Sequence, residues 1–360
     1  MRTHWCHYYP YTENNDVAVF NHTAFDGHEQ VMFCHDPETG LKAIIAIHNT
    51  NCGPAVGGCR MWNYASDDEA LTDVLRLSRG MTYKNAMAGL PFGGGKSVII
   101  GDAKTMKSEA LFRAFGRYLN TLGGRYVTAE DVGTSTTDIA HILKETDYVA
   151  GIEGMSGDPS PFTALGTYLG IKAAVKHKLG RDDLEGLTVA VQGLGSVGYY
   201  LCEHLNKAGA KLFVTDINQD ALKKAEAELG ATIVGLDEIY DLDVDVYAPC
   251  ALGATVNDNT LGRIKASIIA GCANNQLAEA RHDQAVRDKG ILYAPDYVIN
   301  AGGIINVSFE KDYDAAKATA KVEEIYATLM DIFQRADAEN KGTGIVADVM
   351  AREIIARGGK

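Results

Sequence analysis

The 360-residue sequence has no apolar run near the roughly 20 residues that a membrane-spanning helix needs. Its seven cysteines are scattered along a long chain, which is unlike the even, closely spaced set of a disulfide framework. Lysine and arginine number 34 against 47 aspartates and glutamates, and the net charge of −13 argues against a nucleic-acid-binding surface. The composition therefore predicts a soluble protein with neither a membrane nor a nucleic-acid partner.

The first sixteen residues are polar and aromatic and lack the apolar core of a secretory signal. Unpaired cysteines are typical of a reducing compartment, so we expect a cytoplasmic protein. His4, Cys6 and His7 lie close together here, but a structural zinc site needs about four ligands and no second pair follows nearby. We predict an N-terminal extension over residues 1–16 and no metal site.

The length of the chain favours two domains, because one hydrophobic core rarely supports this many residues. In the first, over residues 17–150, we expect strands at 30–35 and 42–48, a helix that Ser66 caps and that runs towards Met81, a glycine-rich loop at 89–95, and a helix at 108–122. A turn-rich hinge over 154–161 separates it from the rest.

After Gly151 the strand and helix signals alternate strictly. The expected strands span 188–192, 211–215, 232–234, 245–248, 267–270 and 291–294. This alternation predicts a doubly wound parallel sheet over residues 151–335. A last segment, 336–360, contains a helix near 346–356 that could pack back on the first domain. The fold class is thus α/β with two domains.

Residues 189–198 run from a buried strand through the pattern G-x-G-x-x-G into a helix. In such a turn one glycine bends the chain, one lets the backbone approach a pyrophosphate, and one lets helix and strand pack closely. The next strand ends at Asp216, whose carboxylate would bind ribose hydroxyls and repel a 2′-phosphate. The alternative is a glycine turn in a domain without a ligand. The pattern predicts NAD as the cofactor, held by Gly193, Leu194, Gly195, Ser196, Val197, Gly198 and Asp216.

The segment around Lys96 resembles a nucleoside-triphosphate-binding P-loop but fails two requirements. Gly89 and Gly95 enclose five residues where that motif has four, and a helix precedes the segment where a strand should. What remains is Lys96 on a glycine loop, Lys84 twelve residues earlier, and Asp131 in a polar loop.

Two lysines and a carboxylate are the groups that the oxidation of an amino acid requires. One ammonium can hold the substrate carboxylate, and a second, buried near a like charge, would have its pKa lowered from about 10.4 so that it exchanges protons near neutrality. The carboxylate can take a proton from the substrate ammonium. From these residues alone, ordinary ion pairs remain the alternative.

From about residue 17 onward the chain resembles the Glu/Leu/Phe/Val dehydrogenase family, and within it the leucine-oxidising members. The resemblance rests on residues 57–62, 80–85, 90–96, 128–133, 248–253, 273–277 and 295–303. It implies a catalytic and oligomer-forming first domain, a Rossmann NAD-binding domain, and an active site in the cleft between them. It also implies a homo-oligomer, with an octamer and a dimer as alternatives.

By the same resemblance Lys84 binds the substrate carboxylate, Lys96 is the catalytic lysine, and Asp131 assists proton transfer. A hydride would leave the substrate α-carbon for NAD, and water activated by Lys96 would attack the resulting iminium ion to give a 2-oxo acid and ammonia. The resemblance also places the cofactor beside Thr163, Cys250, Ala251 and Asn275.

The substrate follows from the expected side-chain pocket. Glutamate-oxidising members have a lysine where this sequence has Val56, so a buried γ-carboxylate would remain unpaired, at a cost of several kcal/mol. Leucine is therefore expected, and valine and isoleucine too, because one methylene is worth only about 1–3 kcal/mol. The segment 90–92 is closer to the glutamate and phenylalanine members, which leaves phenylalanine as the alternative substrate. A silent amino-acid or nucleotide sensor is the non-enzyme alternative. The residues expected to line the pocket are Val56, Gly57, Gly58, Ala129, Ile304 and Val307.

Overall fold

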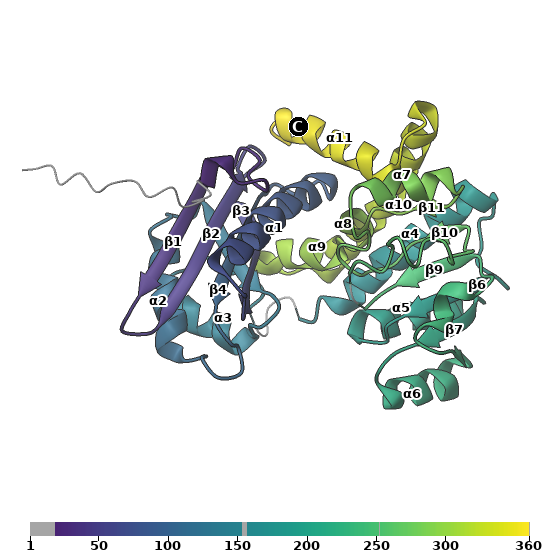
Figure 1. The fold of residues 1–360 in the computed structure, drawn as a ribbon, viewed down its shortest axis with the longest axis horizontal. Helices are drawn as coiled ribbons and strands as arrows, with labels where there is room; N and C mark the ends of the chain where they lie inside the picture. The colour runs from purple at the N-terminus through teal and green to yellow at the C-terminus, as the bar shows by residue number, and fades with distance from the viewer. Residues whose placement is uncertain (1–18, 153–156, 252, 360) are drawn as a thin grey trace, which may run out of the picture.

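The computed structural model describes residues 19–152, 157–251 and 253–359. The expected N-terminal extension with His4, Cys6 and His7 lies outside these residues, as do residues 153–156 at the expected hinge. The described chain forms two lobes, each built on one β-sheet (Figure 1). Within the described ranges, no helix is both long and apolar enough to cross a membrane.

The first sheet has five strands in the order β1-β2-β4-β3-β5. β1 and β4 both pair antiparallel with β2, whereas β3 pairs in parallel with β4 and β5. The two strands expected at 30–35 and 42–48 are confirmed, but β3 was not expected, because its two glycines interrupt the pattern of a strand. The strands are β1 Gln30–Asp36, β2 Leu41–Asn49, β3 Ala55–Trp62, β4 Gly93–Ile100 and β5 Tyr126–Glu130.

Helices cover both faces of this sheet. α1 (Asp67–Met87) packs on the face that carries Ile44 and Val98, while α2 (Glu109–Asn120) and α3 (Thr136–Leu143) pack on the opposite face. Ser66 caps α1 as expected by accepting a hydrogen bond from the Glu69 backbone. The helix continues past Met81 and therefore includes Lys84.

The glycine-rich segment corrects the sequence prediction. A loop was expected over 89–95, but Gly93, Gly94 and Gly95 belong to β4. A Cβ at Gly94 would lie 2.0 Å from the Thr82 backbone nitrogen of α1. The missing side chain thus lets the helix backbone lie directly on the strand. Lys96 consequently lies in an internal strand, a more rigid support than a loop.

The second sheet has six strands, all paired in parallel, in the order β11-β10-β9-β6-β7-β8. This confirms the expected doubly wound sheet. Its strands are β6 Thr188–Gln192, β7 Lys211–Thr215, β8 Thr232–Ile233, β9 Val246–Pro249, β10 Ile268–Ile269 and β11 Leu292–Tyr293. Its helices are α4 Ser160–Leu179, α5 Ser196–Lys207, α6 Gln219–Leu229, α7 Arg281–Asp288 and α10 Ala315–Glu339.

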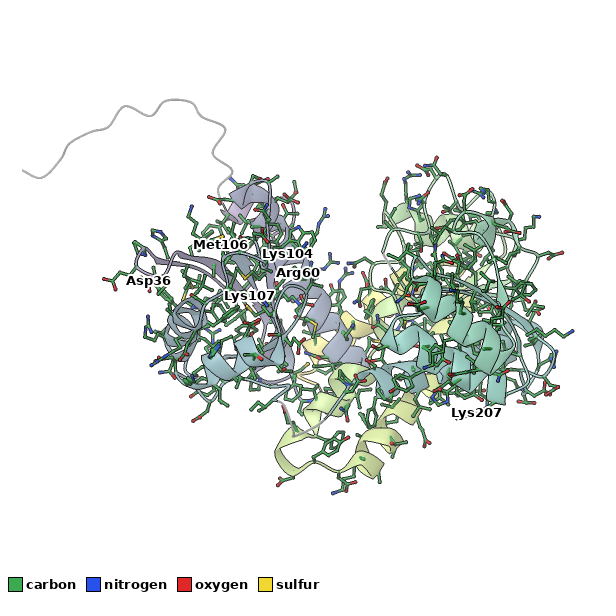
Figure 2. The ribbon with its side chains drawn as sticks, turned by 90° about the horizontal axis from the view of Figure 1, so that it is seen from below. Asp36, Arg60, Lys104, Met106, Lys107 and Lys207 are labelled. Carbon is green, nitrogen blue, oxygen red and sulfur yellow. The ribbon has the colours of Figure 1, made fainter. Side chains whose placement is uncertain are left out.

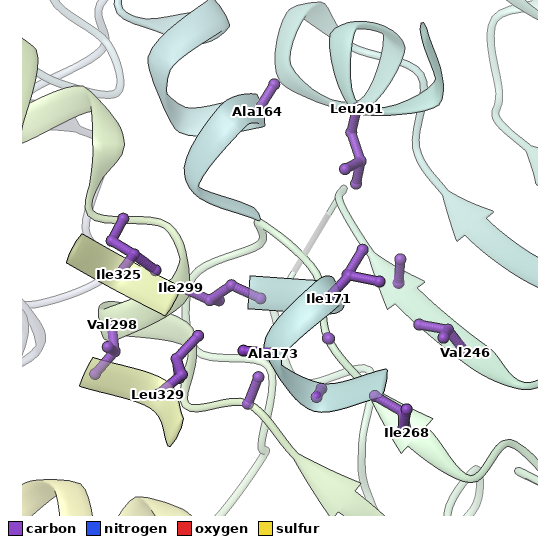
Figure 3. Close-up of a cluster of buried hydrophobic side chains, with 14 of the residues drawn as sticks. Ala164, Ile171, Ala173, Leu201, Val246, Ile268, Val298, Ile299, Ile325 and Leu329 are labelled. Atoms are coloured by element: carbon purple, nitrogen blue, oxygen red, sulfur yellow. The ribbon is translucent and has the colours of Figure 1, made fainter. Parts of the chain in front are cut away.

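The core of the second lobe lies between this sheet and the helices α4, α5 and α10. Figure 3 shows Ile171 of α4 beside Val246 of β9, with Ile299 and Leu329 on the other side of the helix. A Cβ at Gly170 would lie 2.4 Å from Ile299 Cγ1, so α4 depends on this glycine for its close packing.

Three further helices lie where the lobes meet: α8 (Asp296–Ile299), α9 (Gly302–Ser308) and α11 (Thr343–Ala356) (Figure 1). Arg352 Nε on α11 donates to the Tyr83 hydroxyl of α1 at 2.9 Å. Arg79 of α1 lies 3.7 Å from Asp348 of α11. The C-terminal helix therefore packs on α1 of the first lobe.

Candidate active site

Lys96 and Asp131 form an ion pair on the face of the first sheet that α1 covers. Lys96 Nζ lies 2.7 Å from Asp131 Oδ2. Lys96 is buried, whereas the Asp131 side chain is 22% exposed. The pair is therefore held inside the lobe but can be reached from the side of the carboxylate.

Asp131 stays ionised because two cations surround it. Burial alone would raise the pKa of Asp131, but the Lys96 ammonium and the Arg60 guanidinium outweigh it and hold that pKa below its ordinary value. Arg60 Nε donates to Asp131 Oδ2 at 3.1 Å. Gly58 makes room for the carboxylate, since a Cβ there would lie 2.7 Å from Asp131 Cβ. At neutral pH, Asp131 is thus an ionised carboxylate, the form that a proton acceptor requires.

Lys84 reaches from α1 towards the second lobe. Its Nζ donates to Asn274 Oδ1 at 3.4 Å. Burial lowers the pKa of Lys84 to about 8, with Asp296 acting against this effect and Lys96 adding to it. The partner Asn274 is neutral, so it does not compensate for the burial. From the sequence, a lowered pKa was expected on Lys96, the proton-exchanging lysine. The structure shows one on Lys84, the lysine expected to bind the substrate carboxylate.

We expect isocaproate, a carboxylate without an amino group, to bind more weakly as the pH rises above about 8. Lys84 is an ammonium below its pKa and a neutral amine above it, so the Kd should rise about tenfold per pH unit. Calorimetric titration across this range measures the change, and Lys84→Met, which cannot titrate, should bind weakly without this pH dependence. A wild-type Kd that stays constant would contradict carboxylate binding by Lys84.

Sequence reasoning missed several polar side chains that hold these groups. Asn274 Oδ1 accepts a hydrogen bond from Asn300 Nδ2 at 2.8 Å as well as the one from Lys84. Arg60 stands in the motif at 57–62 but was assigned no role. The sequence did contain a signal for Arg60. It lies two residues after Gly58, an expected pocket residue, and alternate residues of a strand share a face.

The expected pocket residues fall into two groups. Val56 pairs with Gly94 and Val127, and Ala129 pairs with Gly58, so adjacent strands bring these positions together with Gly57. Ile304 and Val307 are half-buried on the second lobe, three residues apart on α9. Ile304 packs against the hydrophobic cluster that includes residues of both lobes, and its neighbour Ile305 lines a small cavity together with Met87 of α1.

The glycine turn after β6 suits a dinucleotide. Gly193 has a φ of +106°, and a Cβ there would lie 2.7 Å from Ala251 Cβ. A Cβ at Gly198 would lie 2.1 Å from the Gly193 carbonyl oxygen. At Gly195, by contrast, no described atom lies within 4 Å of that position, and α5 begins at Ser196. The open side of Gly195, at a helix N-terminus, leaves the space that a cradle for a pyrophosphate needs.

Asp216 is fixed beside this turn. Its Oδ2 accepts a hydrogen bond from the Leu194 backbone at 2.5 Å, and its Oδ1 accepts one from the Asn218 backbone at 2.7 Å. These bonds hold the carboxylate at the carboxyl end of β7, next to the turn. The turn, the cradle and the carboxylate together fit the dinucleotide that the sequence predicts.

The other expected cofactor residues lie at two places. Cys250 follows β9, and Asn275 lies beyond β10 with a φ of +52°, held where its carbonyl accepts a hydrogen bond from Ala254 N at 2.6 Å. Both are at the carboxyl edge of the parallel sheet, where ligands bind in such folds. Thr163 lies near the start of α4, beside α9: a Cβ at Gly303 would be 2.9 Å from its Oγ1.

Family models match both lobes. Residues 28–148 match the model described as Glu/Leu/Phe/Val dehydrogenase, dimerisation domain, and residues 214–344 match the model described as Glutamate/Leucine/Phenylalanine/Valine dehydrogenase. The chain belongs to this family of NAD(P)-dependent enzymes and is an amino-acid dehydrogenase. The family predicted from the motifs is confirmed.

Individual relatives are similar along most of their length. The chain is 55% identical over 344 residues to leucine dehydrogenase of Bacillus cereus, covering 94% of each chain. It is 51% identical over 318 residues to phenylalanine dehydrogenase of Lysinibacillus sphaericus, covering 86% of this chain and 84% of that one. The crystal structure of L-tryptophan dehydrogenase from Nostoc punctiforme superposes with a TM-score of 0.83 at 48% identity, over 93% of this chain and 97% of that chain.

Proposed function

We propose that this enzyme oxidises L-leucine, and also L-valine and L-isoleucine, to the 2-oxo acid and ammonia with NAD as the hydride acceptor. The observation that carries the proposal is the contact of Lys96 with Asp131, both of which interact electrostatically with Lys84, next to the paired strands that carry the apolar Val56 and Ala129. A carboxylate binder, a proton-exchanging pair and an apolar lining are what a small aliphatic amino acid requires.

Each of the three polar residues has a distinct task in this proposal. The Lys84 ammonium binds the substrate carboxylate. Asp131 accepts the proton of the substrate ammonium at its carboxylate. Lys96 exchanges a proton with Asp131, which it contacts, and with the water that attacks the oxidised carbon. When bound, NAD supplies hydride acceptance at its nicotinamide ring; the residues that would hold it are those of the turn at 193–198 with Asp216.

The surroundings of Asp216 favour NAD over NADP. Its carboxylate is fixed by two backbone N–H groups, so it cannot easily turn away from a 2′-phosphate. The following residues, Ile217 and Asn218, carry no positive charge that could bind such a phosphate. Both features act against NADP.

Aromatic amino acids are the second candidate substrates. The relatives named for phenylalanine and tryptophan are 51% and 50% identical to this chain, close to the 55% of the leucine dehydrogenase. Against them stands Ala129, since the family resemblance implies a smaller residue at this position in aromatic-specific members. Glutamate is disfavoured because Val56 offers its side-chain carboxylate no partner.

Initial rates of NADH formation test this assignment. The panel is leucine, valine, isoleucine, phenylalanine, tryptophan and glutamate, each with NAD and with NADP. We expect kcat/KM for leucine to exceed that for the aromatic residues by at least about tenfold, with valine and isoleucine within about tenfold of leucine. A preference for phenylalanine or tryptophan would overturn the leucine assignment. No NADH from any amino acid would favour the silent sensor.

We infer a homo-oligomer formed through the first lobe, since the family model over residues 28–148 is described as a dimerisation domain. Phe33 and Trp62 are large apolar side chains exposed on this lobe, as such an interface needs. All six cysteines among the described residues are free, which supports a reducing cytoplasm.

A further inference from the structure

Arg60 joins three elements of the first lobe. It lies on β3, and Figure 2 labels it on the lobe that also carries Lys104 and Lys107. Its Nε donates to Asp131 Oδ2 at 3.1 Å, and its Nη1 donates to Asp73 Oδ2 at 3.0 Å. The Arg60 side chain is 24% exposed, so most of it is removed from water.

Asp73 anchors a second nitrogen of the Arg60 guanidinium, one that does not contact Asp131. Asp73 lies on α1, and its Oδ2 accepts a second hydrogen bond from the Tyr64 hydroxyl at 2.6 Å. A guanidinium is planar and its N–H groups have fixed directions, so anchoring one edge sets the direction of the other. Arg60 therefore presents its Nε to Asp131 in one orientation.

Asp131 carries one negative charge but contacts two cations, so Arg60 is not needed merely to neutralise it. Lys96 already lies 2.7 Å from Asp131 Oδ2, and Arg60 binds that same oxygen. Two cations on one oxygen prevent the carboxylate from rotating, because rotation would break both contacts. Gly58 leaves the space in which the carboxylate is held. The arrangement fixes the direction of Asp131 as well as its charge.

We propose that Arg60 is a positioning residue for the oxidation of the amino acid, orienting Asp131 for proton transfer, and that Asp73 and Tyr64 hold Arg60 in this role. The inference rests on the proposed function, which assigns proton transfer to Asp131 and Lys96. In this proposal Arg60, Asp73 and Tyr64 act through Asp131 and not directly on the substrate or the cofactor.

Removal of Arg60 would change the titration of Asp131 in a definite direction. Burial would oppose the negative charge with only Lys96 in contact to offset it, so the pKa of Asp131 should rise. The acidic limb of the pH profile should then move to higher pH, because protonated Asp131 cannot accept a proton. The other titratable groups that interact electrostatically with Asp131 are Lys84 on α1, Tyr64 after β3, Glu130 on β5 and, from the opposite face of the sheet, Cys59 and Tyr126. Asp73 on α1 contacts Arg60 instead.

The test measures kcat/KM against pH for Arg60→Gln, Arg60→Lys and Asp73→Asn, with whichever L-amino acid the wild type oxidises best. In Arg60→Gln we expect the acidic limb of the profile to shift to higher pH by about one unit and kcat to fall about tenfold or more. Arg60→Lys keeps the positive charge but lacks the planar guanidinium that can contact Asp131 and Asp73 together. The acidic limb of its pH profile should therefore stay nearer that of the wild type, while kcat still falls. NADH binding, followed by fluorescence, should change by less than about twofold in each, because none of these residues lies at the dinucleotide turn.

Arg113→Gln is the matched control. Arg113 lies on α2, on the opposite face of the same sheet, and its Nε donates to Glu145 at 2.7 Å. Loss of this ion pair should leave both kcat and the acidic limb unchanged. If Arg60→Gln fails to fold, Arg60→Lys and Asp73→Asn carry the same comparison.

A double variant separates positioning from a purely structural role. With Asp131→Asn already present, Arg60→Gln should cause little further loss of kcat, because the group that it orients is gone. Independent losses, or an unmoved acidic limb together with a lower Tm, would overturn the proposal. Full activity of Lys96→Ala would instead refute the proposed proton transfer itself, whatever the Arg60 variants show.

Discussion

Lys96→Ala should lower kcat for amino-acid oxidation by about 10²- to 10⁴-fold, the usual contribution of a proton-transferring side chain. Lys96 places an ammonium 2.7 Å from Asp131 Oδ2. The other cation that contacts this carboxylate, Arg60, cannot replace it, since a guanidinium does not release a proton near neutrality. Alanine therefore removes the group that can exchange a proton with Asp131, while Arg60 still neutralises the carboxylate and supports the fold.

Steady-state rates and NADH fluorescence titration measure this effect. NADH should still bind to Lys96→Ala, because the dinucleotide turn is on the other lobe. Lys144→Ala serves as the control: its Nζ lies 2.8 Å from Glu109 in an exposed ion pair, and the substitution should change kcat little. Activity of Lys96→Ala at the level of this control would exclude the proton-transfer role.

Gly195→Val should weaken NADH binding by about 100-fold or more while leaving the Tm unchanged. A Cβ at this position meets no described atom within 4 Å, and the φ of −63° is ordinary for any residue. Valine therefore fits the free protein. The same open space is where the backbone would approach the pyrophosphate, so the side chain would occupy the ligand's place.

Two other glycines provide the comparison. Gly262 also has no described atom within 4 Å of its Cβ position, so Gly262→Val should leave both the Tm and NADH binding unchanged. Gly198→Val should instead lower the Tm, because its Cβ would lie 2.1 Å from the Gly193 carbonyl oxygen. Fluorescence titration with thermal melting distinguishes the three. Tight NADH binding by Gly195→Val would show that the dinucleotide does not cross this turn.

The sequence predicts the second lobe better than the first, because the second is built from locally recognisable units. β6 and β7 have the bounds expected from alternating strand and helix signals. In the first lobe, β3 was missed and the start of β4 was taken for a loop. Glycine disfavours strands locally. Here Gly94 lies against the backbone of α1, while Gly57 and Gly58 lie against Gly95 of β4 and against Asp131, so a side chain at any of these positions would clash. That reason lies in another part of the chain.

The candidate site was predictable only in part: residues within recognisable motifs could be named, but their contacts with distant parts of the chain could not. Lys84, Lys96 and Asp131 stand in motifs with a recognisable composition, so they could be named from the sequence. Arg60 could not be connected with Asp131, because that contact follows from the pairing of β3 with β5, strands far apart in sequence. The same applies to Asn274, which meets Lys84 only because the second lobe lies against α1.

The position of Lys96 within β4 affects how the enzyme should lose activity on heating. β4 is hydrogen-bonded to β2 on one side and β3 on the other, and its residues are almost all buried. Amides in such a strand exchange with solvent mainly through global opening, unlike those of a fraying loop. Lys96 is therefore expected to lie in the part of the lobe that opens last. Heat inactivation arising at this residue should follow the cooperative unfolding of the first lobe rather than a local softening that precedes it.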